Sequence, residues 1–109
     1  MELTSSVLSS IKDMLQITDD VFDAELITHL NSAYFNAIQL GFTNKLIDPD
    51  TIWMELGDDV TAIMGLPAYL YLKIRIAFDP PTGSILSAFE RQITEYEWRV
   101  TVQNESMAT

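Results

Sequence analysis

The sequence contains no cysteine and a single histidine, His29, among its 109 residues. Without thiols the chain can form neither a disulfide nor a thiolate metal site, and this composition fits a reducing compartment. Glu25 lies four residues before His29, but the pattern offers no third metal ligand. Asp48, Asp50 and Glu55 lack the central glycine and the final glutamate of an EF-hand loop. We therefore expect no metal, no cofactor and no enzymatic activity.

Cations are also scarce, because six Lys and Arg stand against sixteen Asp and Glu, for a formal charge of −10. Nucleic-acid binding depends on cations that displace the counterions of phosphate. The closest cationic pair in this chain is Lys73 and Arg75. The charge therefore disfavours direct binding of DNA or RNA, whereas an acidic wall along which DNA slides is compatible with it.

Long apolar runs are missing as well. The longest, residues 66–78, contains Lys73 and Arg75 and is too short and too charged to span a membrane. The first residues show no basic segment followed by an apolar one, so we expect no secretion signal. The length fits one domain, which we assign to residues 1–103, with a polar C-terminal tail at 104–109.

Helical periodicity dominates the first half of the chain. Apolar residues predict a helix over 7–15, with N-cap candidates at Thr4, Ser5 and Ser6. A second apolar stripe predicts a helix from about 19 to 40, with Thr18 as its N-cap and with Ile17 and Phe22 as a hydrophobic staple. Gly41 follows at the position of a left-handed C′ residue.

The middle of the chain is less regular. Residues 42–50 predict a loop, and Asp50 is a candidate cap for a short helix over 51–56, in which Trp53 is expected to anchor to the core. For residues 58–65 the pattern does not decide between helix and loop. Pro67 suits the first turn of a helix over 68–78, although a buried strand is the alternative for this run. Pro80 and Pro81 end that helix.

A last helix is predicted from Ile85 to about Gln103, with Ser84 as its cap. A 3-4-3-4 spacing marks one apolar seam on it, formed by Leu86, Phe89, Ile93, Tyr96 and Val100. The seam either forms a coiled coil between subunits or packs on this chain's own helices, above all the one over 22–40. We favour the second, because only two heptads are present. The fold class is thus all-α: a small bundle of four main helices and one short helix.

Several segments resemble the head–tail connector proteins of tailed bacteriophages, also called adaptor or head-completion proteins. The similarity covers residues 10–103, and its most specific parts are a helix stop, Phe78-Asp79-Pro80-Pro81, and a helix end with Glu95, Glu97, Trp98 and Arg99. The resemblance implies a structural protein in the neck of the virion, made in the host cytoplasm. It implies a ring, commonly of twelve copies, that lies below the portal protein, extends the DNA channel and docks a tail-side neck component.

The resemblance also implies that the C-terminal helix contacts the portal or another partner. We expect that interface at Trp98, Arg99, Val100, Val102, Gln103 and Asn104, and salt bridges between subunits at Arg75 and Arg91. Trp98 lies off the apolar seam, and an exposed tryptophan is a typical interface hot spot. The alternative function is an acidic helical interaction module, such as an antitoxin or an inhibitor of a basic protein.

Overall fold

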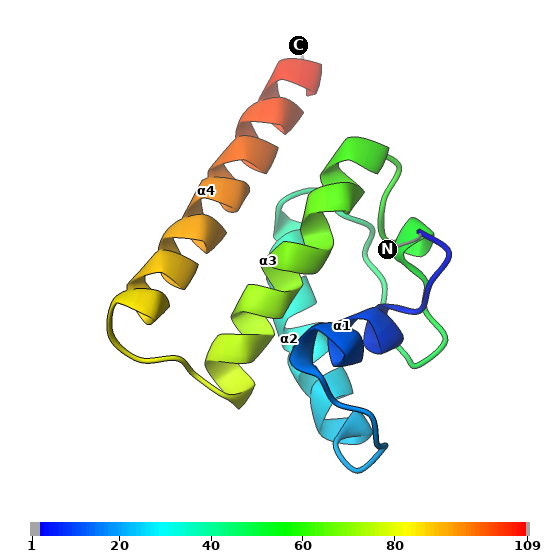
Figure 1. Cartoon of the computed structure of the whole chain (residues 1–109). Helices are drawn as coiled ribbons and strands as arrows, with labels where there is room; N and C mark the ends of the chain where they lie inside the picture. Colours follow the sequence, from blue (N-terminus) through cyan, green and yellow to red (C-terminus); the bar gives the residue numbers. More distant parts are fainter. Residues whose placement is uncertain (1–2, 109) are drawn as a thin grey trace.

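The computed structural model describes residues 3–108, and for 104–108 it describes the backbone alone. In chain order the elements are α1 (Val7–Leu15), α2 (Asp23–Gln39), a 3₁₀ helix η1 (Trp53–Leu56), α3 (Val60–Phe78) and α4 (Gly83–Ala108). The part of the chain so described contains no β-strand, only an isolated bridge between Ser6 and Ile52. The predicted all-α bundle is therefore confirmed (Figure 1).

α1 has the predicted bounds, because both ends are capped locally. The Ser6 hydroxyl accepts a hydrogen bond from the Ser9 amide at 3.3 Å. At the other end Gln16 adopts a left-handed conformation, with φ of 61°, and its amide donates to carbonyls of the last turn. These caps satisfy groups that the helix ends would otherwise leave unpaired.

α2 begins at Asp23, so the prediction of Thr18 as its N-cap was wrong. The Asp19 carboxylate accepts a hydrogen bond from the Val21 amide at 3.1 Å, which holds residues 19–22 in a turn. Phe22 then precedes the helix and meets Phe78 edge-on, with ring centroids 5.5 Å apart. The predicted C′ glycine is confirmed, since Gly41 follows the helix with φ of 114°.

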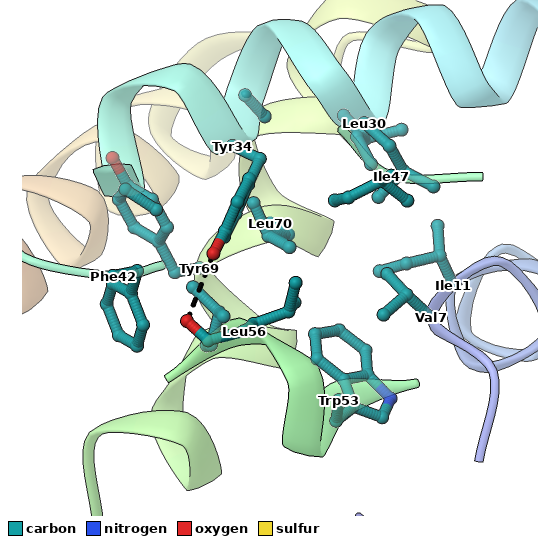
Figure 2. Close-up of a cluster of buried hydrophobic side chains, with 14 of the residues drawn as sticks. Val7, Ile11, Leu30, Tyr34, Phe42, Ile47, Trp53, Leu56, Tyr69 and Leu70 are labelled. Atoms are coloured by element: carbon teal, nitrogen blue, oxygen red, sulfur yellow. Dashed lines mark hydrogen bonds between the residues drawn. The ribbon is translucent and has the colours of Figure 1, made fainter. Parts of the chain in front are cut away.

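Residues 42–50 form a loop, as predicted, which continues to residue 52 and is held to the bundle by α2. The Asn31 side chain accepts from the Ile47 amide and donates to the Ile47 carbonyl. The Tyr34 hydroxyl lies 2.6 Å from the Thr43 carbonyl and 3.0 Å from that of Leu56 (Figure 2). These bonds satisfy backbone groups that a loop leaves without secondary-structure partners.

The short helix is η1, which starts at Trp53 rather than at residue 51. Asp50 does not cap it; instead the Glu55 carboxylate accepts from the Ile52 amide at 2.9 Å. Trp53 is fully buried, as predicted (Figure 2). Its indole donates to the Ser10 hydroxyl of α1 at 3.0 Å. The loop between α2 and α3 therefore contributes to the core.

α3 begins at Val60, seven positions before the predicted first-turn proline. Asp59 caps it, because its Oδ1 accepts from the amides of Thr61 and Ala62 at 3.0 and 3.3 Å. Pro67 lies inside the helix, where proline removes one hydrogen bond. The strand alternative for 68–78 is wrong. Burial of Ile63 and Leu66, at 2% and 0% exposure, favours the helical start despite the proline.

α3 is the central element, since α1, α2, η1 and α4 all pack on it (Figure 1). By length and composition it is the one described helix that could cross a membrane. That property is also typical of a core helix. The core lies where α1, α2, η1 and α3 meet, and Figure 2 shows side chains from each of them in contact range there.

α4 contributes least to this core. Among residues 83–103 the buried one is Val100, while Ile93 and Tyr96 are partly buried against the core. The preference for packing within the chain is thus confirmed, but α4 packs mainly on α3 rather than on the helix over 22–40. α4 also continues to Ala108, so the predicted helix end near Gln103 was wrong.

Candidate interaction site on the C-terminal helix

An aromatic contact at a glycine holds the middle of α4 on α3. Tyr96 lies over Gly65, so close that a Cβ built on Gly65 would be 2.6 Å from the ring. The Tyr96 hydroxyl donates to the Ala62 carbonyl at 2.8 Å, and its ring stacks on Tyr69 with centroids 4.9 Å apart. Gly65 therefore sets how closely the two helices approach.

A polar cluster lies beside this contact. The Tyr69 hydroxyl donates to the Glu97 carboxylate at 2.6 Å, and Lys73 approaches both Glu97, at 3.9 Å, and the face of the Tyr69 ring, at 5.2 Å. Burial and the Glu97 carboxylate raise the pKa of Tyr69, because both disfavour its phenolate. Tyr69 thus stays neutral and keeps α4 in register.

Among the residues of α4 whose side chains the structure describes, 83–103, the last hydrogen bond to the rest of the bundle lies at the start of α3. The Gln103 amide donates to Oδ2 of Asp59 at 2.6 Å, while Oδ1 of the same carboxylate caps α3. Beyond this point α4 runs past the beginning of α3, and its end projects from the bundle (Figure 1). Five more helical residues, 104–108, make up the projecting end.

The outer side of α4 faces away from α3. Arg91, Glu95, Trp98 and Val102 recur at 4-3-4 spacing, about half a turn from the buried seam. We call these four residues the Trp98 face. The Trp98 side chain is 64% exposed and Val102 is 38% exposed. In residues 3–103 no carboxylate forms a salt bridge with Arg91.

The structure separates the residues that were expected to form one interface. Trp98 and Val102 are exposed on the Trp98 face, whereas Val100 is only 6% exposed and belongs to the core. Arg99 is exposed and paired with Glu95 of its own helix. Gln103 contacts Asp59, as described above. Asn104 is helical, and its side chain lies outside the described residues.

The two arginines expected between subunits also differ from each other. Arg75 has partners within the chain: its Nε donates to the Asp79 carbonyl at 2.8 Å, and its guanidinium donates to the Tyr71 hydroxyl at 3.2 Å. These bonds fix Arg75 at the end of α3. Arg91 forms no salt bridge within residues 3–103 and is exposed.

The acidic residues considered as metal ligands have structural contacts instead. In the described residues no group of three His, Cys, Asp or Glu side chains could hold a metal ion. Asp48 accepts from the Asp50 amide at 2.8 Å, a bond that lowers the pKa of Asp48 by favouring its charged form. His29 lies 3.8 Å from Glu25 and meets Phe78 edge-on.

Sequence reasoning missed Gly65 and Asp59 as residues that position α4. A usable signal was that Gly65 stands in an apolar stretch, because a glycine retained within a helix can have a packing reason. Asp59 lies in residues 58–65, which the pattern left open, and its bond to Gln103 depends on where α4 packs. No periodicity could have indicated that contact.

The comparisons with known proteins agree with this structure. A sequence model described as phage connector protein matches residues 7–107, which is nearly the whole chain. No curated protein and no solved structure matches the chain significantly. The match includes the bundle and almost all of α4, and it favours the predicted connector over the acidic inhibitor. The chain therefore belongs to the phage connector protein family, whose members are structural components of the head–tail junction of phage virions.

Proposed function

We propose that the chain forms a ring, of twelve copies, between the portal and the tail of a phage particle. In this arrangement the ring extends the DNA channel and presents a platform to a tail-side neck protein. Family membership supports a connector role. The chain is synthesised in the host cytoplasm and acts in the neck of the virion.

The observation that carries the docking part of this proposal is the projecting end of α4 (Figure 1). Because α4 is anchored up to Gln103, the residues beyond can enter a neighbouring protein without unfolding the bundle. We assign Val102, Asn104 and the helix end to the portal contact. We assign to contacts with a partner chain three exposed residues of α4, which are Arg91, Trp98 and Arg99.

The charge of the chain supports a passive role toward DNA. With a net charge of −10, the ring repels phosphate, so a translocating duplex does not adhere to the channel wall. We expect no measurable binding of duplex DNA at physiological salt, since affinity depends on cations that this chain lacks.

The test is deletion of residues 104–109. We expect this variant to keep its helical far-UV circular dichroism and its melting temperature within a few degrees, because it keeps the bond between Gln103 and Asp59 and the packing of α4 on α3. Binding to the portal encoded in the same genome should be lost, as measured by co-sedimentation and by electron microscopy of rings. A matched control is Phe35→Ser, which changes an exposed side chain on α2. Unchanged portal binding by the shortened chain would disprove the assignment.

A further inference from the structure

The Trp98 face is part of a second heptad seam on α4, opposite the seam that packs on α3. Its positions recur along the helix at alternating spacings of four and three, over about 28 Å. They are Ser84, Ala88, Arg91, Glu95, Trp98 and Val102, and we call them the outer seam. Ala88 is partly exposed and the others are exposed. Because α4 packs mainly on α3 and lies at the edge of the bundle (Figure 1), this seam is open to a second chain.

The outer seam is complementary to itself in one antiparallel register. We align two copies of α4 antiparallel, with a two-fold axis level with Ile93, so that each seam position lies opposite a different one. Arg91 of each copy is then opposite Glu95 of the other. The small Ala88 is opposite the large Trp98, so the indole has room between the helices. Each of these pairings occurs twice in the pair of chains.

The charges of the outer seam favour contact with a second copy. Arg91 forms no salt bridge within residues 3–103. Glu95 binds Arg99 of its own helix through Oε1, and in the same residues Oε2 has no ion-pair partner. The opposite copy's Arg91 can therefore bind Oε2 while the bond within the helix is kept. Seam charges sum to zero on a chain of −10, so copies repel each other least here.

The positions that flank the outer seam also fit this register. In an antiparallel pair, flanking positions on the same side of the seam meet each other. Near the two-fold axis, Thr94 meets Thr94 on one side and Gln92 meets Gln92 on the other. Farther from the axis, Ser87 meets Thr101. These side chains are neutral and exposed, so none of these contacts opposes the pairing of the charged seam residues.

We propose that two copies of the free chain pair through the outer seam in this antiparallel register, with Trp98 of each copy on Ala88 of the other and with Arg91 bound to Glu95. The pair goes beyond the proposed function, because a two-fold contact is closed and by itself builds no ring. It covers Arg91 and Trp98 until another protein takes the place of the second copy. The contact uses one helix of each chain, so the dissociation constant is on the order of 0.1 mM.

Charge reversal tests the pairing, with sedimentation equilibrium of the full chain as the measurement. We expect Arg91→Glu and Glu95→Arg each to weaken dimerisation by about tenfold, because each places like charges opposite one another. The two variants change the net charge in opposite directions, so general repulsion between acidic chains would not weaken both. A chain with both substitutions should regain wild-type dimerisation, since the opposite charges are restored with their positions exchanged. Circular dichroism confirms that each variant is folded.

Thiol cross-linking tests the register, because the chain has no cysteine of its own. With a short bismaleimide, Thr94→Cys should couple with itself. Thr101→Cys should couple with Ser87→Cys but not with itself, because antiparallel pairing places the two copies of position 101 about 24 Å apart along the helices. Coupling of Thr101→Cys with itself would indicate parallel pairing and would overturn the proposal.

Two further results would also refute the pairing. One is a chain that stays monomeric at millimolar concentration, which would leave the Trp98 face to a protein of another sequence. The other is a double charge reversal that dimerises no better than the single variants. Deletion of residues 104–109, the test of portal binding, keeps the whole outer seam. Loss of portal binding and loss of pairing are therefore separate results, and the failure of one proposal leaves the other in place.

Discussion

Replacing Gly65 by alanine should loosen the packing of α4 on α3. The added Cβ would lie 2.6 Å from one carbon of the Tyr96 ring and 3.3 Å from a second. The ring has little freedom to move, because its hydroxyl donates to the Ala62 carbonyl and its face stacks on Tyr69. Either Tyr96 loses these contacts or α4 moves away from α3 along its whole length.

The expected change in the free energy of unfolding combines three contributions. Overpacking of this kind costs about 1–3 kcal/mol of unfolding free energy. Loss of the hydrogen bond from Tyr96 to Ala62 adds about 1 kcal/mol. The higher helix propensity of alanine offsets about 1 kcal/mol. Gly65→Ala should therefore be destabilising by about 1–3 kcal/mol, in a domain where 1 kcal/mol moves the melting temperature by roughly 4 °C.

Urea unfolding, monitored by circular dichroism, measures this change. The same substitution in a chain that also carries Tyr96→Ala tests its cause. In a Tyr96→Ala chain the new methyl group meets no ring, so Gly65→Ala should instead stabilise that chain by about 1 kcal/mol through helix propensity. This reversal of sign is the specific expectation. If Gly65→Ala stabilises the wild-type chain, or destabilises both backgrounds equally, the contact between Tyr96 and Gly65 does not hold α4.

Three further predictions concern the cap of α3, the two tryptophans and alkaline pH. Asp59→Ala removes the cap and the bond to Gln103, so urea unfolding should show a loss of about 1–2 kcal/mol, whereas Asp59→Asn, which keeps a capping oxygen, should lose less. Trp53→Ala should cost about 3–5 kcal/mol because it empties a buried site. Trp98→Ala, at an exposed site, should change stability by less than about 0.5 kcal/mol by the same measurement; a comparable loss for both would contradict the exposure of Trp98. Burial raises the pKa of three tyrosines above the usual 10, so the folded state holds their protons more tightly than the unfolded state. The stabilisation that these protonated tyrosines contribute is fully present below pH 10, and it is lost as the pH rises toward their pKa values in the folded state. A melting temperature that stays constant from pH 9 to 11.5 would contradict the burial of Tyr34, Tyr69 and Tyr96.

Local signals in the sequence determined much of the fold. The all-α class, the bounds of α1, the glycine after α2 and the burial of Trp53 followed from capping residues and apolar spacing. These features depend on contacts within a few residues, so a short window contains their causes. The sequence also indicated the connector family and an exposed Trp98 off the seam of α4.

Helix starts were predicted less well, because local signals compete. Thr18 has the side chain of an N-cap, but the Asp19 carboxylate forms its own turn and delays α2 to Asp23. Pro67 favours a first turn, but Asp59 caps an earlier start, and burial of the preceding turns outweighs the lost hydrogen bond. The outcome depends on how much surface each alternative buries, which is a property of the whole bundle.

The packing partner of α4 and the exposure of its side chains were decided by tertiary structure alone. An apolar seam shows which side of a helix is buried but not against which element, and here a glycine at position 65 admits Tyr96 and selects α3. The same packing buries Val100, leaves Trp98 and Arg91 exposed and pairs Arg75 within its own chain. These relations join residues far apart in the sequence, so they exist only once the chain has folded.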